Sequence, residues 1–124
     1  MKIRTGIDII EISRVKESIE GTNEKFCERV YTEKERKYCE SKKMQKYQHY
    51  AARFSAKEAV FKAISDELGN KFEINWKDIE ILNDEKGRPY VNILNNKIRN
   101  IEDIDISLSH CKEYAIANVV IVFK

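Results

Sequence analysis

Residues 52–64 read ARFSAKEAVFKAI, and this stretch decides how the rest of the chain folds. Its alanines recur at intervals of three and four residues, which places small side chains along one face of a helix, at positions 52, 56, 59 and 63. We expect that face to pack closely against the core. The same stretch carries four charges, and Glu58 and Lys62 stand one turn apart. The sequence therefore predicts a helix with one side for packing and another for polar chemistry.

The segments before this helix predict a strand and three shorter helices. Hydrophobic residues alternate with others over residues 3–10, which indicates a strand with one buried face formed by Ile3, Thr5, Ile7 and Ile9. Ser13 is a candidate N-cap for a helix ended by Gly21, and Asn23 for a helix through about residue 30. Thr32 and Glu35 have capping-box spacing and open a helix through about residue 41.

The long helix is expected to run from about residue 45 to residue 68 and to end at Gly69-Asn70. After Trp76 the pattern alternates, with a turn-rich NDEKGRP at 83–89 between two short strands, which predicts a hairpin. Residues 104–110 and 114–123 predict a second hairpin. With helices mostly in the first half, the fold class is α+β, with an antiparallel sheet built from the N-terminal strand and the C-terminal hairpins.

Length and composition predict one domain over residues 1–124. No run of 18 apolar residues and no signal-peptide pattern is present, so we expect a cytoplasmic protein without a membrane partner. Three cysteines without CxxC spacing indicate reduced thiols.

Cations are concentrated between residues 34 and 57, where eight Lys and Arg side chains face only two glutamates. This predicts a positive surface that attracts phosphates, nucleic acid or an acidic protein. A solvated helix face with excess lysine is the simpler reading of the same pattern.

Two acidic residues occupy positions where a carboxylate is unexpected. Asp8 lies inside an apolar strand, and Glu58 lies among alanines. Each has an ordinary explanation: Asp8 at an edge facing water or bonded to backbone, and Glu58 paired with Lys62. Together they suggest a Mg²⁺ site in which both carboxylates bind the ion and Lys62 binds a phosphate. Arg53 lies about 140° around the helix from Glu58, so only its long side chain would let it reach another phosphate.

Five motifs follow one another in an order typical of a known family. They are GIDIIEI at 6–12, RFSAKEAVFKAI at 53–64, WKDIEI at 76–81, GRPYV at 87–91 and SLSHCKEYAIA at 107–117. Over nearly its whole length the chain resembles the holo-[acyl-carrier-protein] synthases, the short single-domain type of the 4'-phosphopantetheinyl transferase superfamily. The resemblance implies the fold of that superfamily and a reaction in support of fatty acid biosynthesis.

The resemblance also implies roles for individual residues. Asp8 and Glu58 would bind Mg²⁺, and Lys62 would contact the phosphates of the co-substrate coenzyme A. The nucleotide part of coenzyme A would lie against the remaining predicted cofactor-binding residues, Arg53, His110, Gly87 and Pro89. Glu58, acting directly or through a metal-bound water, is the favoured acceptor of the proton that leaves the serine hydroxyl of the acyl carrier protein, although an acid of the carrier protein is an alternative.

The reaction that the resemblance implies transfers 4'-phosphopantetheine from coenzyme A to a serine of apo acyl carrier protein and releases adenosine 3',5'-bisphosphate. Relatives bind their acidic carrier with the helix after the first strand, so Arg14 is the expected carrier contact. Relatives also form homotrimers with active sites between subunits.

Two other classes of function stay open from the residues alone. A metal-dependent phosphohydrolase would use the same carboxylates with water, and a nucleic-acid-binding module, not expected given the family, would use the basic segment with Tyr31, Tyr38, Tyr47 and Tyr50.

Overall fold

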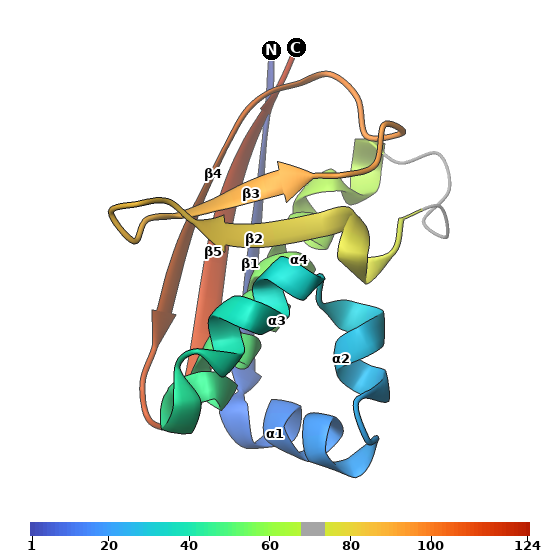
Figure 1. The fold of residues 1–124 in the computed structure, drawn as a ribbon. Coiled ribbons are helices and arrows are strands. Elements are labelled where there is room, and N and C mark those ends of the chain that lie inside the picture. Colours follow the sequence, from blue (N-terminus) through green and yellow to red (C-terminus); the bar gives the residue numbers. More distant parts are fainter. Residues whose placement is uncertain (68–73) are drawn as a thin grey trace.

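The computed structural model describes residues 1–67 and 74–124, and Figure 1 shows their arrangement. The first half contains β1 (Lys2–Glu11), α1 (Ile12–Gly21), α2 (Lys25–Val30), α3 (Glu33–Glu40) and the long α4 (Lys46–Ile64). The second half contains β2 (Ile79–Asn83), β3 (Pro89–Ile93), β4 (Ile101–His110) and β5 (Tyr114–Phe123). Short 3₁₀ segments flank α4 at Lys43–Gln45 and Ser65–Glu67, and another precedes β2 at Trp76–Asp78. The predicted helix end at Gly69-Asn70 lies outside the described residues.

The strands form two antiparallel sheets. β5 lies between β1 and β4 in a three-stranded sheet, while β2 and β3 pair with each other. Lys2 pairs with Phe123, so the two chain ends lie side by side (Figure 1). The predicted α+β class, both hairpins and the use of the N-terminal strand in the sheet are confirmed. In the described part of the chain, no helix is both long and apolar enough to cross a membrane.

The alanine face of α4 packs directly against the three-stranded sheet. The four alanines of this face are between 0% and 3% exposed. Gly6 of β1 lies so close that a Cβ atom at this position would stand 1.9 Å from the carbonyl oxygen of Ala59. Small residues on both elements therefore bring the backbone of β1 against the backbone of α4, and this contact positions the candidate site.

The predicted buried face of β1 is wrong. Ile3, Ile7 and Ile9 are 59%, 57% and 62% exposed, while Gly6 is buried and Asp8 is partly buried. Alternation shows which side chains share a face, but it does not show which face another element covers. Here α4 covers the face that carries Gly6, because only that face lets the helix approach closely. The isoleucine face is left on the outside of the sheet, where Tyr114 and Val120 of β5 are also exposed.

Helix starts were predicted well at one cap and poorly at two. The Thr32–Glu35 capping box is present, with both of its hydrogen bonds, and Gly21 ends α1. Ser13 is not an N-cap, because α1 follows β1 directly and begins at Ile12. Asn23 is not one either: α2 begins after Glu24, which has a left-handed conformation, and the Thr22 hydroxyl accepts the hydrogen bond from the Phe26 amide instead.

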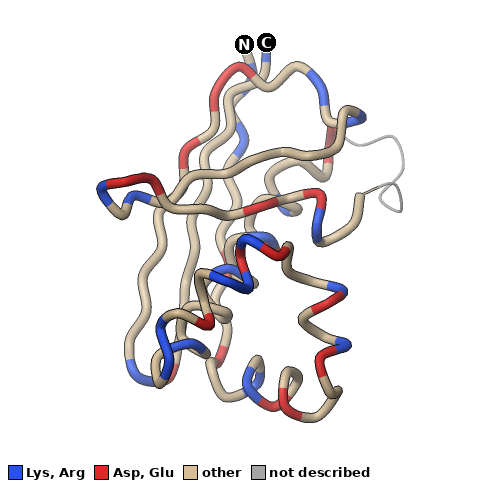
Figure 2. The backbone as a smooth tube through the Cα atoms, viewed as in Figure 1, with Lys and Arg blue, Asp and Glu red and all other residues tan. Residues whose placement is uncertain are grey.

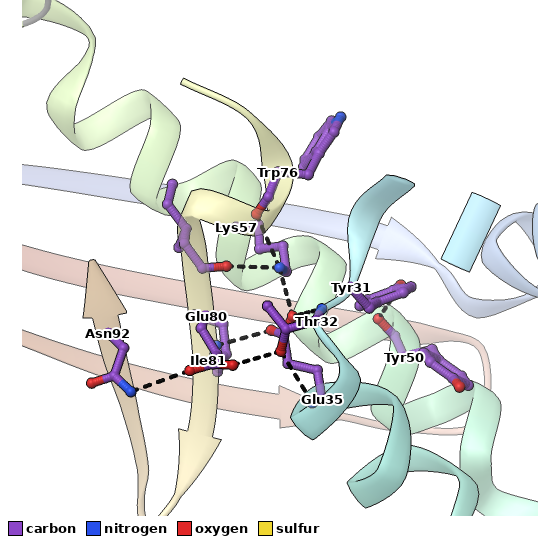
Figure 3. A network of polar contacts seen from close by, with 10 residues as sticks. Tyr31, Thr32, Glu35, Tyr50, Lys57, Trp76, Glu80, Ile81 and Asn92 are labelled. Atoms are coloured by element: carbon purple, nitrogen blue, oxygen red, sulfur yellow. Dashed lines mark hydrogen bonds and ion pairs between the residues drawn. The ribbon is translucent and has the colours of Figure 1, made fainter. Parts of the chain in front are cut away.

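A buried ion pair joins α3, α4 and β2 (Figure 3). The Lys57 ammonium donates to the Glu35 carboxylate at 2.7 Å and to the carbonyl oxygens of Trp76 and Ile79 at 3.0 and 2.7 Å. Glu35 in turn accepts from the amide of Ile81 at 2.9 Å. Both charged side chains are fully buried, and burial lowers the pKa of Lys57 although the Glu35 charge opposes that shift. The pair is satisfied at every ammonium hydrogen, which is what a buried charge requires.

The predicted positive surface is therefore smaller than the sequence indicates. Lys57 is inside the molecule, and Arg53 is only 1% exposed. The other cations of residues 34–46 lie on α3 and around the start of α4, interspersed with acidic residues (Figure 2). Tyr31 and Tyr50 are each 1% exposed, so two of the four tyrosines that a nucleic-acid module would need as stacking surfaces belong to the core.

Candidate active site

Asp8 is held by two side chains of α4. The Ser55 hydroxyl lies 2.8 Å from the Asp8 carbonyl oxygen and 3.0 Å from its carboxylate. The Lys62 ammonium donates to the other carboxylate oxygen at 3.1 Å and to the carbonyl of Ile7 at 3.0 Å. The Asp8 side chain is only 15% exposed, whereas that of Lys62 is 53% exposed. The acid in the strand is thus fixed in place and still open at one side.

Glu58 lies on α4 between Ser55 and Lys62 and is partly buried. Phe54 and Phe61 flank it along the helix, and Trp76 contacts both rings, stacked on Phe54 at 5.0 Å and edge-on to Phe61 at 5.2 Å. These aromatic rings shield the Glu58 carboxylate from water. Burial is the main reason why the pKa of Glu58 is raised. The negative charge of Asp8 raises it further, while Lys62 lowers it.

Two adjoining pockets meet at Glu58. One, of about 310 Å³, is lined by Asp8 and Glu58 together with Arg14 of α1, and by Glu11 and Tyr114. The other, of about 660 Å³, is lined by Glu58 with residues that include Phe61, Trp76, Arg29 and Lys77. The sequence placed Asp8, Glu58 and Arg14 in one functional site, and all three border the same cavity. Arg14 also forms a 3.5 Å ion pair with Glu11.

The donor set fits a hard divalent cation. Asp8 and Glu58 supply carboxylate oxygens to one pocket, and the negative charge of Asp8 disfavours a negative charge on Glu58. Mg²⁺ takes oxygen ligands and commonly binds through one or two carboxylates, with waters and substrate phosphates completing its shell. Within residues 1–67 and 74–124 there is no group of three or more His, Cys, Asp or Glu side chains arranged for a metal.

The residues predicted to bind the nucleotide form a second group. Arg53 lies about 140° around α4 from Glu58, so it points toward the β2–β3 side of the helix. Its guanidinium lies over the Tyr38 ring, 4.2 Å from the centroid, and donates to the side-chain oxygen of Asn83. Within the described chain, its buried Nε atom has no hydrogen-bond partner. Arg53 and Glu58 therefore lie on different faces of α4.

His110, Gly87 and Pro89 lie on the same side as Arg53. His110 is exposed at the end of β4, and its ring is 5.9 Å from that of His49. Gly87 has a φ of +85°, a conformation that favours glycine, in the turn between β2 and β3, and Pro89 begins β3. Burial, followed by the nearby charges of Arg53 and Lys42, lowers the pKa of His49 to about 4.

Sequence reasoning missed three residues that shape these groups. Ser55 orients Asp8, Trp76 encloses Glu58, and Asn83 is the hydrogen-bond partner of Arg53. A signal existed for Ser55, which precedes Glu58 by three residues and so lies near it on the helix. Trp76 and Asn83 each begin a segment with a recognisable pattern in the sequence, but no spacing rule connects them to α4, because their contacts with that helix are made across the fold.

The chain is similar to known proteins over nearly its whole length. Residues 4–119 match the family model for the 4'-phosphopantetheinyl transferase superfamily. A holo-[acyl-carrier-protein] synthase from Ruminiclostridium cellulolyticum is 47% identical over 127 residues, covering 98% of this chain and 92% of the relative. The Helicobacter pylori holo-[acyl-carrier-protein] synthase in complex with coenzyme A superposes with a TM-score of 0.82 at 32% identity, covering 95% of this chain and 99% of that one.

A holo-(acyl-carrier-protein) synthase from Bacillus anthracis in complex with CoA (3',5'-ADP) is also similar. It has a TM-score of 0.79 at 36% identity, with 95% of this chain and 94% of that chain covered. The match to the family model spans most of the chain, and the similarity to the synthases extends over nearly its full length. The chain therefore belongs to the 4'-phosphopantetheinyl transferase superfamily and, within it, to the holo-[acyl-carrier-protein] synthases.

Proposed function

We propose that this protein transfers 4'-phosphopantetheine from coenzyme A to a serine of apo acyl carrier protein, releasing adenosine 3',5'-bisphosphate. The observation that carries the proposal is the group formed by Asp8, Glu58 and Lys62. Two carboxylates and an ammonium converge beside one pocket, in a chain whose relatives are holo-[acyl-carrier-protein] synthases and include coenzyme A complexes.

In the proposed reaction the serine oxygen forms a bond to the β-phosphorus of coenzyme A. The bond from that phosphorus to the oxygen bridging the two phosphates breaks, and the bridging oxygen leaves with adenosine 3',5'-bisphosphate. Glu58 accepts the serine proton, and Lys62, whose side chain is 53% exposed, binds a phosphate oxygen. Phosphoryl transfer needs positioning and charge neutralisation more than covalent help from the protein, which suits this small set of groups.

We assign Asp8 and Glu58 as the protein ligands of Mg²⁺. When bound, the ion would neutralise charge on the phosphate oxygens of coenzyme A. Ser55 supports the assignment because its hydroxyl fixes the Asp8 carboxylate from the buried side and leaves the open side to the pocket.

Arg14 is the proposed contact for the carrier protein. Its side chain is 75% exposed and lines the pocket that holds the two carboxylates. A cation at the edge of this pocket would bind an acidic carrier close to the reacting serine, and mutual attraction of opposite charges would also speed encounter.

We further propose that the protein assembles as a homotrimer with its active sites between subunits. Two observations support this assembly. The outer face of β1 and β5 exposes Ile3, Ile7, Ile9 and other apolar side chains, and the nucleotide group around Arg53 lies away from the carboxylate group of the same protomer. A neighbouring subunit would complete each site. Light scattering after size-exclusion chromatography tests the assembly: the parent protein should have three times the chain mass, and Ile7→Asp should lower it.

Intact-mass spectrometry of apo acyl carrier protein tests the reaction. The carrier is incubated with this protein, coenzyme A and Mg²⁺, with a parallel sample in chelator. A gain of one phosphopantetheine group that disappears with chelator is the expected result. With an active carrier and a known transferase as control, an unchanged carrier mass would refute the proposed transfer.

The hydrolase alternative predicts a different product distribution. Water in place of serine would release 4'-phosphopantetheine from coenzyme A without any carrier. Chromatography of the coenzyme A sample incubated with enzyme and Mg²⁺ alone should therefore show no loss of coenzyme A if the protein is a transferase.

A further inference from the structure

A continuous series of contacts joins three of the four residues predicted to bind the nucleotide, namely Gly87, Arg53 and His110. Gly87 contacts Asn83, whose side chain contacts Arg53, and Arg53 lies on the ring of Tyr38. Two aromatic contacts extend the series, because the Tyr38 ring is 5.5 Å from the ring of His49 and His49 is 5.9 Å from His110. Four separate elements contribute to it, namely α3, α4, the β2–β3 hairpin and β4.

Asn83 is the polar link in this series. Its side-chain oxygen accepts from the Arg53 guanidinium, and its side-chain nitrogen donates to the Gly87 carbonyl at 2.9 Å. The orientation of the amide is determined by these partners, because a guanidinium only donates and a carbonyl only accepts. An asparagine is one of the few side chains that satisfy both at once, since its neighbouring oxygen and nitrogen play opposite roles.

The turn that Asn83 contacts is anchored from two further directions. The Asp84 carboxylate accepts from the amides of Lys86 and Arg88, each at 2.9 Å. The Arg88 guanidinium reaches both carboxylate oxygens of Asp105 on β4, at 2.9 and 3.0 Å. The Asp84 and Arg88 contacts are on exposed side chains, whereas Asn83 connects the turn to a guanidinium that is 1% exposed. Asn83 is therefore the link between the exposed turn and the interior.

We propose that Asn83 is a positioning residue for the nucleotide end of coenzyme A, because it holds the Gly87 turn and the Arg53 guanidinium in a fixed relation. The proposal rests on the proposed function, since it takes coenzyme A as the ligand. Asn83 does not act on the transferred phosphate, which belongs to the Asp8 and Glu58 group. Its loss should weaken binding of the nucleotide and leave the chemical step nearly intact.

The test compares Asn83→Leu and Asn83→Asp with a matched control, Asn96→Leu. Leucine keeps the approximate shape and removes both hydrogen bonds. Aspartate keeps an acceptor for Arg53 but loses the donor to the Gly87 carbonyl and adds a negative charge. Asn96 is an exposed asparagine in the loop between β3 and β4. Calorimetry measures the affinity for adenosine 3',5'-bisphosphate, and the carrier assay gives kcat and the KM for coenzyme A.

Asn83→Leu should bind adenosine 3',5'-bisphosphate about tenfold or more weakly, the range for a lost hydrogen bond to a charged group. Asn83→Asp keeps its bond to Arg53 and should bind this nucleotide about threefold or more weakly, because it loses the bond to the Gly87 carbonyl and adds a negative charge. The KM for coenzyme A should rise by a similar factor, kcat should stay within about threefold of the parent value, and the Asn96 variant should match the parent. A merely structural role would lower the melting temperature without this division between KM and kcat. If Asn83→Leu does not fold, Asn83→Asp decides the question.

Affinity within twofold of the parent in a folded Asn83 variant would overturn the proposal. So would a fall in kcat with an unchanged KM. Failure of the proposed function has a different appearance: the parent protein itself would leave the carrier mass unchanged. The two failures are therefore distinguishable in the same set of experiments.

Discussion

Gly6→Ala should both destabilise the protein and misplace Asp8, because β1 and α4 touch through their backbones at this residue. The added Cβ would lie 1.9 Å from the Ala59 carbonyl oxygen, 2.8 Å from its carbonyl carbon and 3.2 Å from the Ala63 nitrogen. None of these atoms is the end of a flexible side chain. The strand and the helix would have to separate by about 1.5 Å to restore an ordinary contact.

The expected cost follows from the kind of contact. Overpacking of a core by a methyl group typically costs about 1–3 kcal/mol, and a rigid backbone on both sides places this variant at about 3 kcal/mol or more. For a chain of this length that corresponds to a fall in melting temperature of about 12 °C. Asp8 is two residues from Gly6 on the same face of β1, so its bonds to Ser55 and Lys62 would be stretched as well. A displacement of about 1 Å can cost about a hundredfold in rate.

Gly21→Ala is the matched control. A Cβ at Gly21, the last residue of α1, would have nothing within 4 Å, so its unfolding free energy should stay within about 0.5 kcal/mol of the parent. Circular dichroism melts and urea titrations measure both variants, and the carrier assay measures transfer. A Gly6→Ala protein that melts within about 2 °C of the parent would refute the backbone contact.

Three further predictions concern charged groups. Asp8→Asn and Glu58→Gln should each abolish transfer in the mass assay while keeping the parent circular dichroism spectrum; near-full activity in either would contradict the metal site. Lys57→Met should cost about 3–5 kcal/mol in urea titrations, since it leaves a buried carboxylate unpaired, whereas Lys62→Met on the same helix should cost less than about 1 kcal/mol yet reduce transfer. Because the pKa of His49 is lowered to about 4, the free energy of unfolding of the parent protein should fall relative to that of His49→Phe as the pH falls from about 6.5 to 4. The reason is that the histidine of the unfolded chain takes up its proton at a higher pH than the folded one. Parallel curves of unfolding free energy against pH for the two proteins would be inconsistent with this shift.

Local patterns in the sequence predicted what local physics determines. The capping box at Thr32 and the packing face of α4 depend on spacing along one helix, and both are present. The β2–β3 hairpin follows from turn residues between two alternating runs, and it is present as well. The covered face of β1 depends instead on which element approaches, and alternation alone is the same for either choice. The decisive residue is Gly6, which lies on the opposite face of β1 from Ile3, Ile7 and Ile9 and allows α4 to approach.

The pattern of charges along the sequence predicts the surface of the protein least well where the fold buries a charged side chain. Lys57 and Glu58 are adjacent in sequence, yet a rotation of 100° along the helix puts one in the core and the other beside a pocket. Lys57 binds a carboxylate of α3 and the carbonyl oxygens of Trp76 and Ile79, just before and at the start of β2. No spacing rule connects these partners to it. Counting it with the surface lysines therefore overstated the positive surface.

The arrangement of α4 explains why a chain this short can present two ligand-binding groups. Its alanine face allows β1 to approach closely, and that closeness brings the Asp8 carboxylate within reach of the Ser55 hydroxyl. A longer side chain at position 59, which is fully buried in this contact, would separate the strand from the helix and the Asp8 and Glu58 carboxylates from each other. On the far side of the same helix, Arg53 is fixed by Asn83 and faces the β2–β3 turn. One rigid helix thus sets the position of both groups and places them on different faces of the same element, which is the arrangement that the proposed trimer would complete with a neighbouring subunit.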